Sequence, residues 1–94
     1  MQKEKYARTP AWIIARYSRI WYLKKENTFT FYWYLNNIED DIKIGLVVLS
    51  RLRKMGWIST ETNQKDKRKS IYRLIRPEQI FNRMGREELV VNEN

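Results

Sequence analysis

The stretch EDDIKIGLVVLSRLRKMGWI, residues 39–58, is the most informative part of the chain, because it carries the start, the body and the end of one helix. Acids at positions 39 to 41 suit the positive N-terminal end of a helix, and basic residues at 51, 53 and 54 suit its negative end. Gly56 follows where a helix commonly ends in a left-handed residue. The pattern predicts a helix over residues 41–55.

This helix has two unlike faces. Four aliphatic residues and a glycine that would let another helix approach closely share one side, which we expect to be buried. They are Ile42, Gly45, Leu46, Leu49 and Leu52. The opposite side is largely basic, is centred near Val47 and can lie against nucleic acid. Its residues are Lys43, Ile44, Val47, Ser50, Arg51 and Lys54.

Two alternating, β-branched runs, WISTET and SIYRLI, follow Gly56 and predict a hairpin over residues 57–75. The segment between them, NQKDKRKS, contains the turn formers Asn63 and Asp66 within a basic cluster. A nuclear localisation signal is an alternative use of KDKRK, but the flanking strands favour a loop held on a stalk. The residues expected to contact phosphate are Lys65, Lys67, Arg68, Lys69 and Arg73.

The segment before residue 39 predicts two more helices. Thr9 and Pro10 are typical of a helix start, and a helix over 10–25 should bury Ile13, Tyr17, Ile20 and Trp21. Residues 1–8 are expected to form a flexible arm. Residues 28–37, TFTFYWYLNN, suit either a strand or a short helix capped by Thr28 or Thr30, and we favour the helix. Most of their five aromatics should fill the core, although a stacking platform or an aromatic-ligand pocket is the alternative.

Both terminal helices offer apolar residues beyond those a core needs. Pro77 opens a helix over 77–91, whose end should fray. A helix with apolar residues on two sides usually has two partners, so we expect a homodimer. The residues expected at the dimer contact are Trp12, Ala15, Tyr22 and Leu23 of the first helix. Ile80, Phe81 and Met84 of the last helix are expected to contribute to that contact or to the core beneath it.

Composition limits the function classes. A chain of 94 residues with 43% apolar residues suits one folded domain. Its net charge of +8 comes from the body and not from a tail, because residues 1–76 hold 17 basic against 7 acidic residues and residues 77–94 hold 2 against 4. There is no Cys and no His, which excludes thiol and histidine chemistry and the usual zinc sites. We therefore expect no enzyme, no metal and no cofactor. The longest apolar run, residues 31–35, is far too short for a membrane span, so we expect a soluble cytoplasmic protein.

Residues 28–76 resemble the winged helix-turn-helix of MarR-type and PadR-type regulators. The resemblance rests on the order of elements and on two short patterns, one ending the 41–55 helix and one in the hairpin. The matching residues are Leu49, Leu52, Gly56, Trp57 and Ile58, then Asp66, Arg68, Tyr72 and Leu74. The resemblance implies a mostly helical α+β fold with a two-stranded wing and terminal dimerisation helices. It also implies a recognition helix at 41–55 in the major groove and a wing at 63–69 on the backbone or in the minor groove.

The chain departs from these families in two ways. Ile44, Val47 and Val48 stand where the families place small polar residues, which reduces hydrogen bonding to bases and leaves apolar contacts to thymine methyl groups. The chain also has no room for a ligand-binding domain, so no obligatory small-molecule ligand is expected.

The expected function is double-stranded DNA binding by a homodimer, most simply as a transcriptional regulator. One alternative is a DNA-coating, architectural or segregation protein. A second is a protein- or RNA-interaction module, because fold does not fix function.

Overall fold

A computed structural model describes residues 10–66 and 69–92, with side chains up to residue 86. The described elements are α2 (Ala11–Lys24), α3 (Phe31–Ile38), α4 (Ile42–Lys54), β1 (Ile58–Thr62), β2 (Ser70–Leu74) and α5 (Pro77–Asn92). The expected mostly helical α+β architecture is therefore confirmed. The predicted arm at 1–8, the capping residue Thr9, and Lys67 and Arg68 lie outside the described residues.

Local capping explains where the central helices begin and end. The Thr30 hydroxyl accepts a hydrogen bond from the Trp33 amide at 3.0 Å, so Thr30, one of the two expected capping residues, caps the short helix. The Asp41 carboxylate accepts from the Ile44 amide at 2.8 Å and caps α4. Gly56, at φ 76°, follows the end of α4 as predicted. Each predicted helix boundary differs from the observed one by no more than three residues.

The core lies where α2, α3, α4 and the base of the hairpin meet. Ile13, Tyr17 and Ile20 of α2 are buried as predicted, and Trp21 packs against the core at its edge. The aromatic segment is mainly core, since four of its five rings are buried or packed against it. Phe29 and Tyr34 are buried, Phe31 and Trp33 are partly buried, and only Tyr32 is largely exposed, at 77%.

The predicted buried face of α4 was wrong by roughly 50° of rotation at 100° per residue. Ile42 and Leu46 are 60% and 55% exposed, whereas Val48, expected on the front, is fully buried. The reason is the position of α3. Gly45 lies at the centre of the contact between the two helices, and a Cβ placed there would be 2.9 Å from Phe31 Cε1. The buried residues are Gly45, Val48, Leu49 and Leu52.

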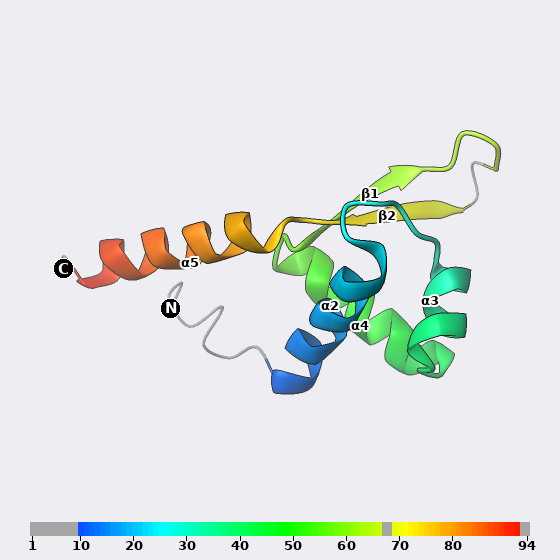
Figure 1. Ribbon diagram of the computed structural model, residues 1–94, viewed down its shortest axis with the longest axis horizontal. Coiled ribbons are helices and arrows are strands. Elements are labelled where there is room, and N and C mark those ends of the chain that lie inside the picture. The colour runs from blue at the N-terminus through cyan, green and yellow to red at the C-terminus, as the bar shows by residue number, and fades with distance from the viewer. Residues whose placement is uncertain (1–9, 67–68, 93–94) are drawn as a thin grey trace.

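The predicted hairpin is present, with β1 antiparallel to β2 and Thr60 opposite Tyr72. A feature the sequence did not indicate is a bridge between Phe29 and Tyr72, whose backbones exchange hydrogen bonds of 2.9 and 2.8 Å. Their rings also stack, with centroids 5.7 Å apart. The segment before α3 thus ties the hairpin to the helices. Figure 1 shows the hairpin extending past α3, away from α5.

Helix α5 projects from the body on the side opposite the hairpin loop (Figure 1), giving the molecule extents of 48 × 26 × 23 Å. It is anchored near its start, where Ile80 is buried and Arg83 Nη1 donates to the Gly56 carbonyl at 3.1 Å. Ile80 therefore belongs to the core, which is one of the two places expected for it. The helix continues through Gly85. Within the described chain, no helix has the length and apolarity needed to cross a membrane.

Candidate nucleic-acid interface

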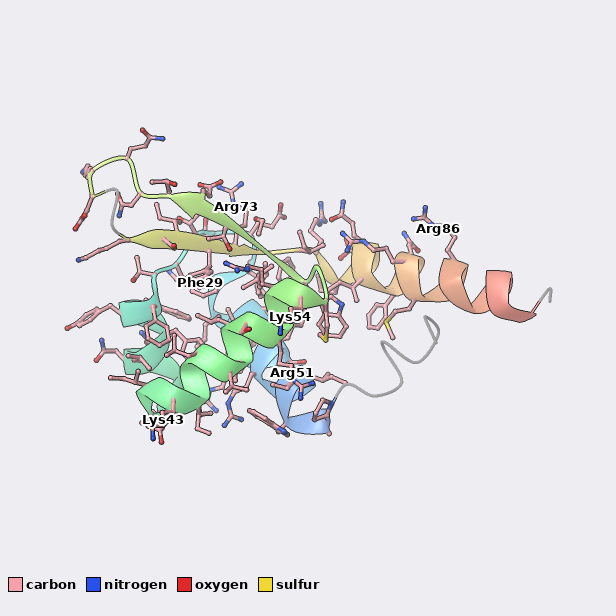
Figure 2. All side chains as sticks on the ribbon, turned by 180° about the vertical axis from the view of Figure 1, so that it is seen from behind. Phe29, Lys43, Arg51, Lys54, Arg73 and Arg86 are labelled. Carbon is pink, nitrogen blue, oxygen red and sulfur yellow. The ribbon has the colours of Figure 1, made fainter. Side chains whose placement is uncertain are left out.

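Helix α4 turns one line of residues directly away from the core. Lys43, Val47, Ser50 and Lys54 follow each other at spacings of four, three and four, and all are exposed. Figure 2 shows α4 in front of the other elements, with Lys43 at its beginning and Lys54 at its end. The helix contains four basic residues and no acidic one. Its outer face therefore presents positive charge at both ends and a short apolar centre.

Two edges flank this line. Arg51 and Ile44, both exposed, lie on one edge, as predicted for the basic face. Leu46 and Arg53 lie on the other edge, which faces the hairpin across a hollow of about 160 Å³ lined also by Leu49, Ser50 and Tyr72. Sequence reasoning missed Arg53 and Leu46 at this surface. The basic last turn was a signal for Arg53, but the exposure of Leu46 depends on the helix rotation described above.

A second hollow of about 470 Å³ lies between the start of α3 and the hairpin. Its lining carries three aromatic rings, four hydroxyl groups and one cation, from Thr30, Phe31, Tyr32, Lys69, Ser70 and Tyr72. Tyr72 borders both hollows. The surface from α4 to the hairpin loop is therefore hollowed on each side of one tyrosine. Two rings of the aromatic segment, Phe31 and Tyr32, line this larger hollow, so the alternative of an aromatic-ligand pocket would be located here.

The hairpin loop carries part of the predicted basic cluster. Lys65 and Lys69 are exposed, and Asn63 shapes the turn by accepting a hydrogen bond from the Lys65 amide at 2.8 Å. Arg73 is exposed on β2. Successive side chains of a strand point to opposite faces, so Arg73 points away from the face of the hairpin where Tyr72 borders the hollow beside α4. Lys67 and Arg68 lie outside the described residues.

A charged network fixes the beginning of α4 relative to α2 and α3. Arg16 Nε and Nη2 donate to the two carboxylate oxygens of Asp40 at 2.8 and 2.7 Å, and the Tyr34 hydroxyl donates to the same carboxylate at 2.5 Å. The hydrogen bond from Arg16 is the main reason that the pKa of Asp40 is lowered, and the bond from Tyr34 adds to it, while partial burial opposes both. Asp40 directly precedes the α4 cap, so this network holds the basic face in place.

Predicted dimer residues on α2 form an exposed face. Trp12, Tyr22 and Leu23 are 40%, 76% and 46% exposed, and Ala15 is exposed as well. The Arg16 guanidinium carbon lies 5.9 Å from the centre of the Trp12 ring. On α5, Phe81 is 68% exposed, and Met84 packs partly against the core. Apolar surface is thus available on both helices.

Among residues 10–66 and 69–92, no cluster of acidic side chains could hold a metal ion. Comparison of the chain with protein-family models, with curated proteins and with solved structures finds no match.

Proposed function

We propose that the protein is a sequence-directed, double-stranded DNA-binding protein that acts as a homodimer, most simply a transcriptional regulator. In this proposal α3 and α4 are a helix-turn-helix pair, α4 is the recognition helix, and the β1–β2 hairpin is the wing, as in the MarR-type and PadR-type families that the sequence resembles. The observation that carries the proposal is the outer face of α4, where Lys43, Arg51 and Lys54 are exposed and no acid occurs along the helix.

The physical fit of α4 to duplex DNA supports this function. The major groove, ~12 Å wide, admits one α-helix of ~10–12 Å diameter. Lys43 and Lys54 are 11 residues apart, which is ~16 Å along the helix axis. Their long side chains can reach phosphates on either side of the groove while Val47 and Ser50 face the base edges. Each neutralised phosphate releases condensed counterions, which makes such binding strong at low salt.

The hairpin and the two hollows beside it extend the same surface. Lys65 and Lys69 stand at the loop, and Arg53 lies at the hairpin edge of α4. A duplex seated on α4 would bring its phosphate backbone toward these cations. The hydroxyl groups of Thr30, Ser70 and Tyr32 in the larger hollow can donate to phosphate oxygens.

We propose a homodimer because one domain presents too short a recognition helix to contact a whole DNA site. The 13 residues of α4 contact only about half of a typical site, and two copies related by a twofold axis would place two such helices ~34 Å apart. The exposed α2 face and Phe81 of α5 supply apolar surface for that contact. No small-molecule ligand is needed for this function.

Fluorescence anisotropy with a labelled random-sequence duplex tests the proposal. The variant carrying Lys43→Ala, Arg51→Ala and Lys54→Ala should bind all duplexes more weakly and with a smaller salt dependence. Arg86→Ala, which removes an exposed charge from α5 far from α4 (Figure 2), is the matched control and should bind as the unmodified protein does. No binding to duplex, or displacement by structured RNA at lower concentration than by DNA, would contradict the proposal.

Footprinting on a duplex that the protein has selected from a random-sequence pool separates a regulator from a DNA-coating or segregation protein. A regulator protects one inverted repeat. A coating protein protects a tract that lengthens as protein is added.

A further inference from the structure

The outer face of α4 combines positive charge with an unusual amount of exposed aliphatic surface. Val47, at the middle of the outward line, is 43% exposed. Ile44 and Leu46, on the two edges, are 37% and 55% exposed. All three lie within one turn of one another, and none can form a side-chain hydrogen bond. In a complex, this surface gains free energy by contacting an apolar group and gains none by contacting a polar one.

The major groove offers one apolar group that α4 could meet. Each base pair presents hydrogen-bond donors and acceptors there, and only thymine adds a methyl group. If Val47 were pressed against guanine or cytosine, polar atoms of the base edge would lose water without gaining a partner, which weakens binding. If it meets a thymine methyl, two apolar surfaces leave water together. Ser50 is the only side chain on the outward line, apart from the lysines, that can hydrogen-bond to a base, and a hydroxyl bonds to any of them.

We infer that α4 selects thymine-containing sites through their 5-methyl groups, with Val47 as the main specificity-determining residue and Ile44 and Leu46 as contacts at its edges. This inference rests on the proposed DNA-binding function. The lysines at both ends of the line favour DNA over an apolar protein partner, because they complement phosphate charge on each side of the apolar centre. Affinity for the site should then depend on methyl groups that take no part in base pairing.

Replacement of thymine by deoxyuridine removes only the 5-methyl group and tests the inference directly. A random duplex pool is selected with the full chain, and the enriched duplex is synthesised with thymine and with deoxyuridine. The thymine duplex should bind more tightly by about fourfold for each contacted methyl group. Val47→Ala should bring the ratio of the two affinities closer to one. Arg86→Ala, the control on α5 away from the outward line, should leave that ratio unchanged.

Equal affinity of the unmodified protein for the two duplexes would overturn the inference. A ratio that Val47→Ala, Ile44→Ala and Leu46→Ala all leave unchanged would also overturn it, because the methyl groups would then act elsewhere. If no sequence is enriched, the thymine and deoxyuridine pools themselves are compared, and equal affinity overturns the inference in the same way. A protein that binds none of these duplexes would instead contradict the proposed function, so the two failures are distinguishable.

Discussion

Asp40 accepts two hydrogen bonds from Arg16 and one from Tyr34, and so joins α2 and α3 to the residue that precedes the α4 cap. Its side chain is 7% exposed and that of Arg16 is 31% exposed, so the ion pair is only partly screened by water. A charge-assisted pair in such a place contributes more than a surface salt bridge does. Correct placement of the basic face of α4 should depend on it.

The lowered pKa of Asp40 gives this pair a pH dependence of known sign. A carboxyl group whose folded-state pKa lies below the ordinary 3.8 stabilises the fold above that pH and loses the contribution as pH falls below it. Asp40→Asn should therefore lower the free energy of unfolding by about 1.5–3 kcal/mol at neutral pH, and by less in acid. Urea unfolding at neutral and acidic pH measures both. Glu39→Gln, at an exposed neighbour, is the control, and an equal loss for both variants would count against the pair.

Leu49 and Arg51 distinguish the two faces of α4 at single positions. Leu49 is 4% exposed, so Leu49→Ala should lower stability by about 2–5 kcal/mol through loss of contacts and a residual cavity. Arg51 is exposed, so Arg51→Ala should preserve stability and weaken DNA binding. Urea unfolding and duplex titration of both variants provide the test. The opposite pattern would mean that α4 is rotated relative to the core.

Sequence patterns predicted some of these residues better than others. Leu49 and Leu52 lie near the middle of the buried face, so an error in helix rotation did not remove them from the core. Ile42, Leu46 and Val48 lie at its edges, where the position of α3 decides burial. The contact of Asp40 with Arg16 joins residues 24 positions apart, and no local spacing indicates it.

The packing of α3 against α4 gives a test with two matched glycines. A Cβ at Gly45 would lie 2.9 Å from Phe31 and 3.2 Å from the buried Tyr34. Overpacking costs about 1–3 kcal/mol, which should exceed the ~1 kcal/mol that alanine gains over glycine in a helix. Gly45→Ala should therefore destabilise the protein.

Gly85→Ala is the control for that change. No described atom lies within 4 Å of a Cβ at Gly85, so alanine there should stabilise α5 by up to about 1 kcal/mol. Thermal unfolding of both variants measures the difference. A stabilising Gly45→Ala would show that α3 and α4 are not in close contact.

The hairpin loop is predicted to contribute phosphate contacts that do not depend on base sequence. The variant with Lys67→Ala, Arg68→Ala and Lys69→Ala should bind every duplex more weakly. The slope of log K against log salt should flatten by about 0.9 for each lost contact. Stability should change little, because loop charges of this kind rarely stabilise a fold. Titrations at several salt concentrations provide the measurement, and an unchanged slope would remove the loop from the interface.

Whole elements were predicted more reliably than their connections. Helices with caps and glycine ends, and a hairpin with alternating strands, follow from local chemistry, so α2, α4, α5 and the hairpin were predicted close to their observed bounds. Residues 28–37 were ambiguous because they have two structural roles. Phe29 pairs with β2 as a strand residue would, and Phe31–Ile38 form α3. Pairing with a strand more than 40 residues away is a long-range contact that local propensity cannot reveal.

At the scale of the whole molecule, the exposed apolar residues of α2 and α5 predict self-association. Hydrophobic burial is insensitive to screening, so a dimer should persist at an ionic strength that releases DNA. The double variant Trp12→Ala and Tyr22→Ala should dissociate it. Tyr32→Ala, an equally exposed aromatic on α3, is the control and should leave it intact. Sedimentation at high salt measures the state, and a monomer at micromolar concentration would contradict both the dimer and the inverted-repeat target.

The most direct test of the central proposal is to locate the DNA-contacting surface on the protein by NMR titration with an enriched duplex. Addition of the duplex should shift the amide resonances of the outward line of α4, which are those of Lys43, Val47, Ser50 and Lys54. It should also shift the resonances of the hairpin loop. Resonances of Trp12 and Tyr22 on α2 should not respond to DNA beyond any effect of dimerisation. Shifts that cluster on α2 and α5 while α4 stays unchanged, or no shifts at saturating duplex, would contradict the assignment of α4 as the DNA-binding helix.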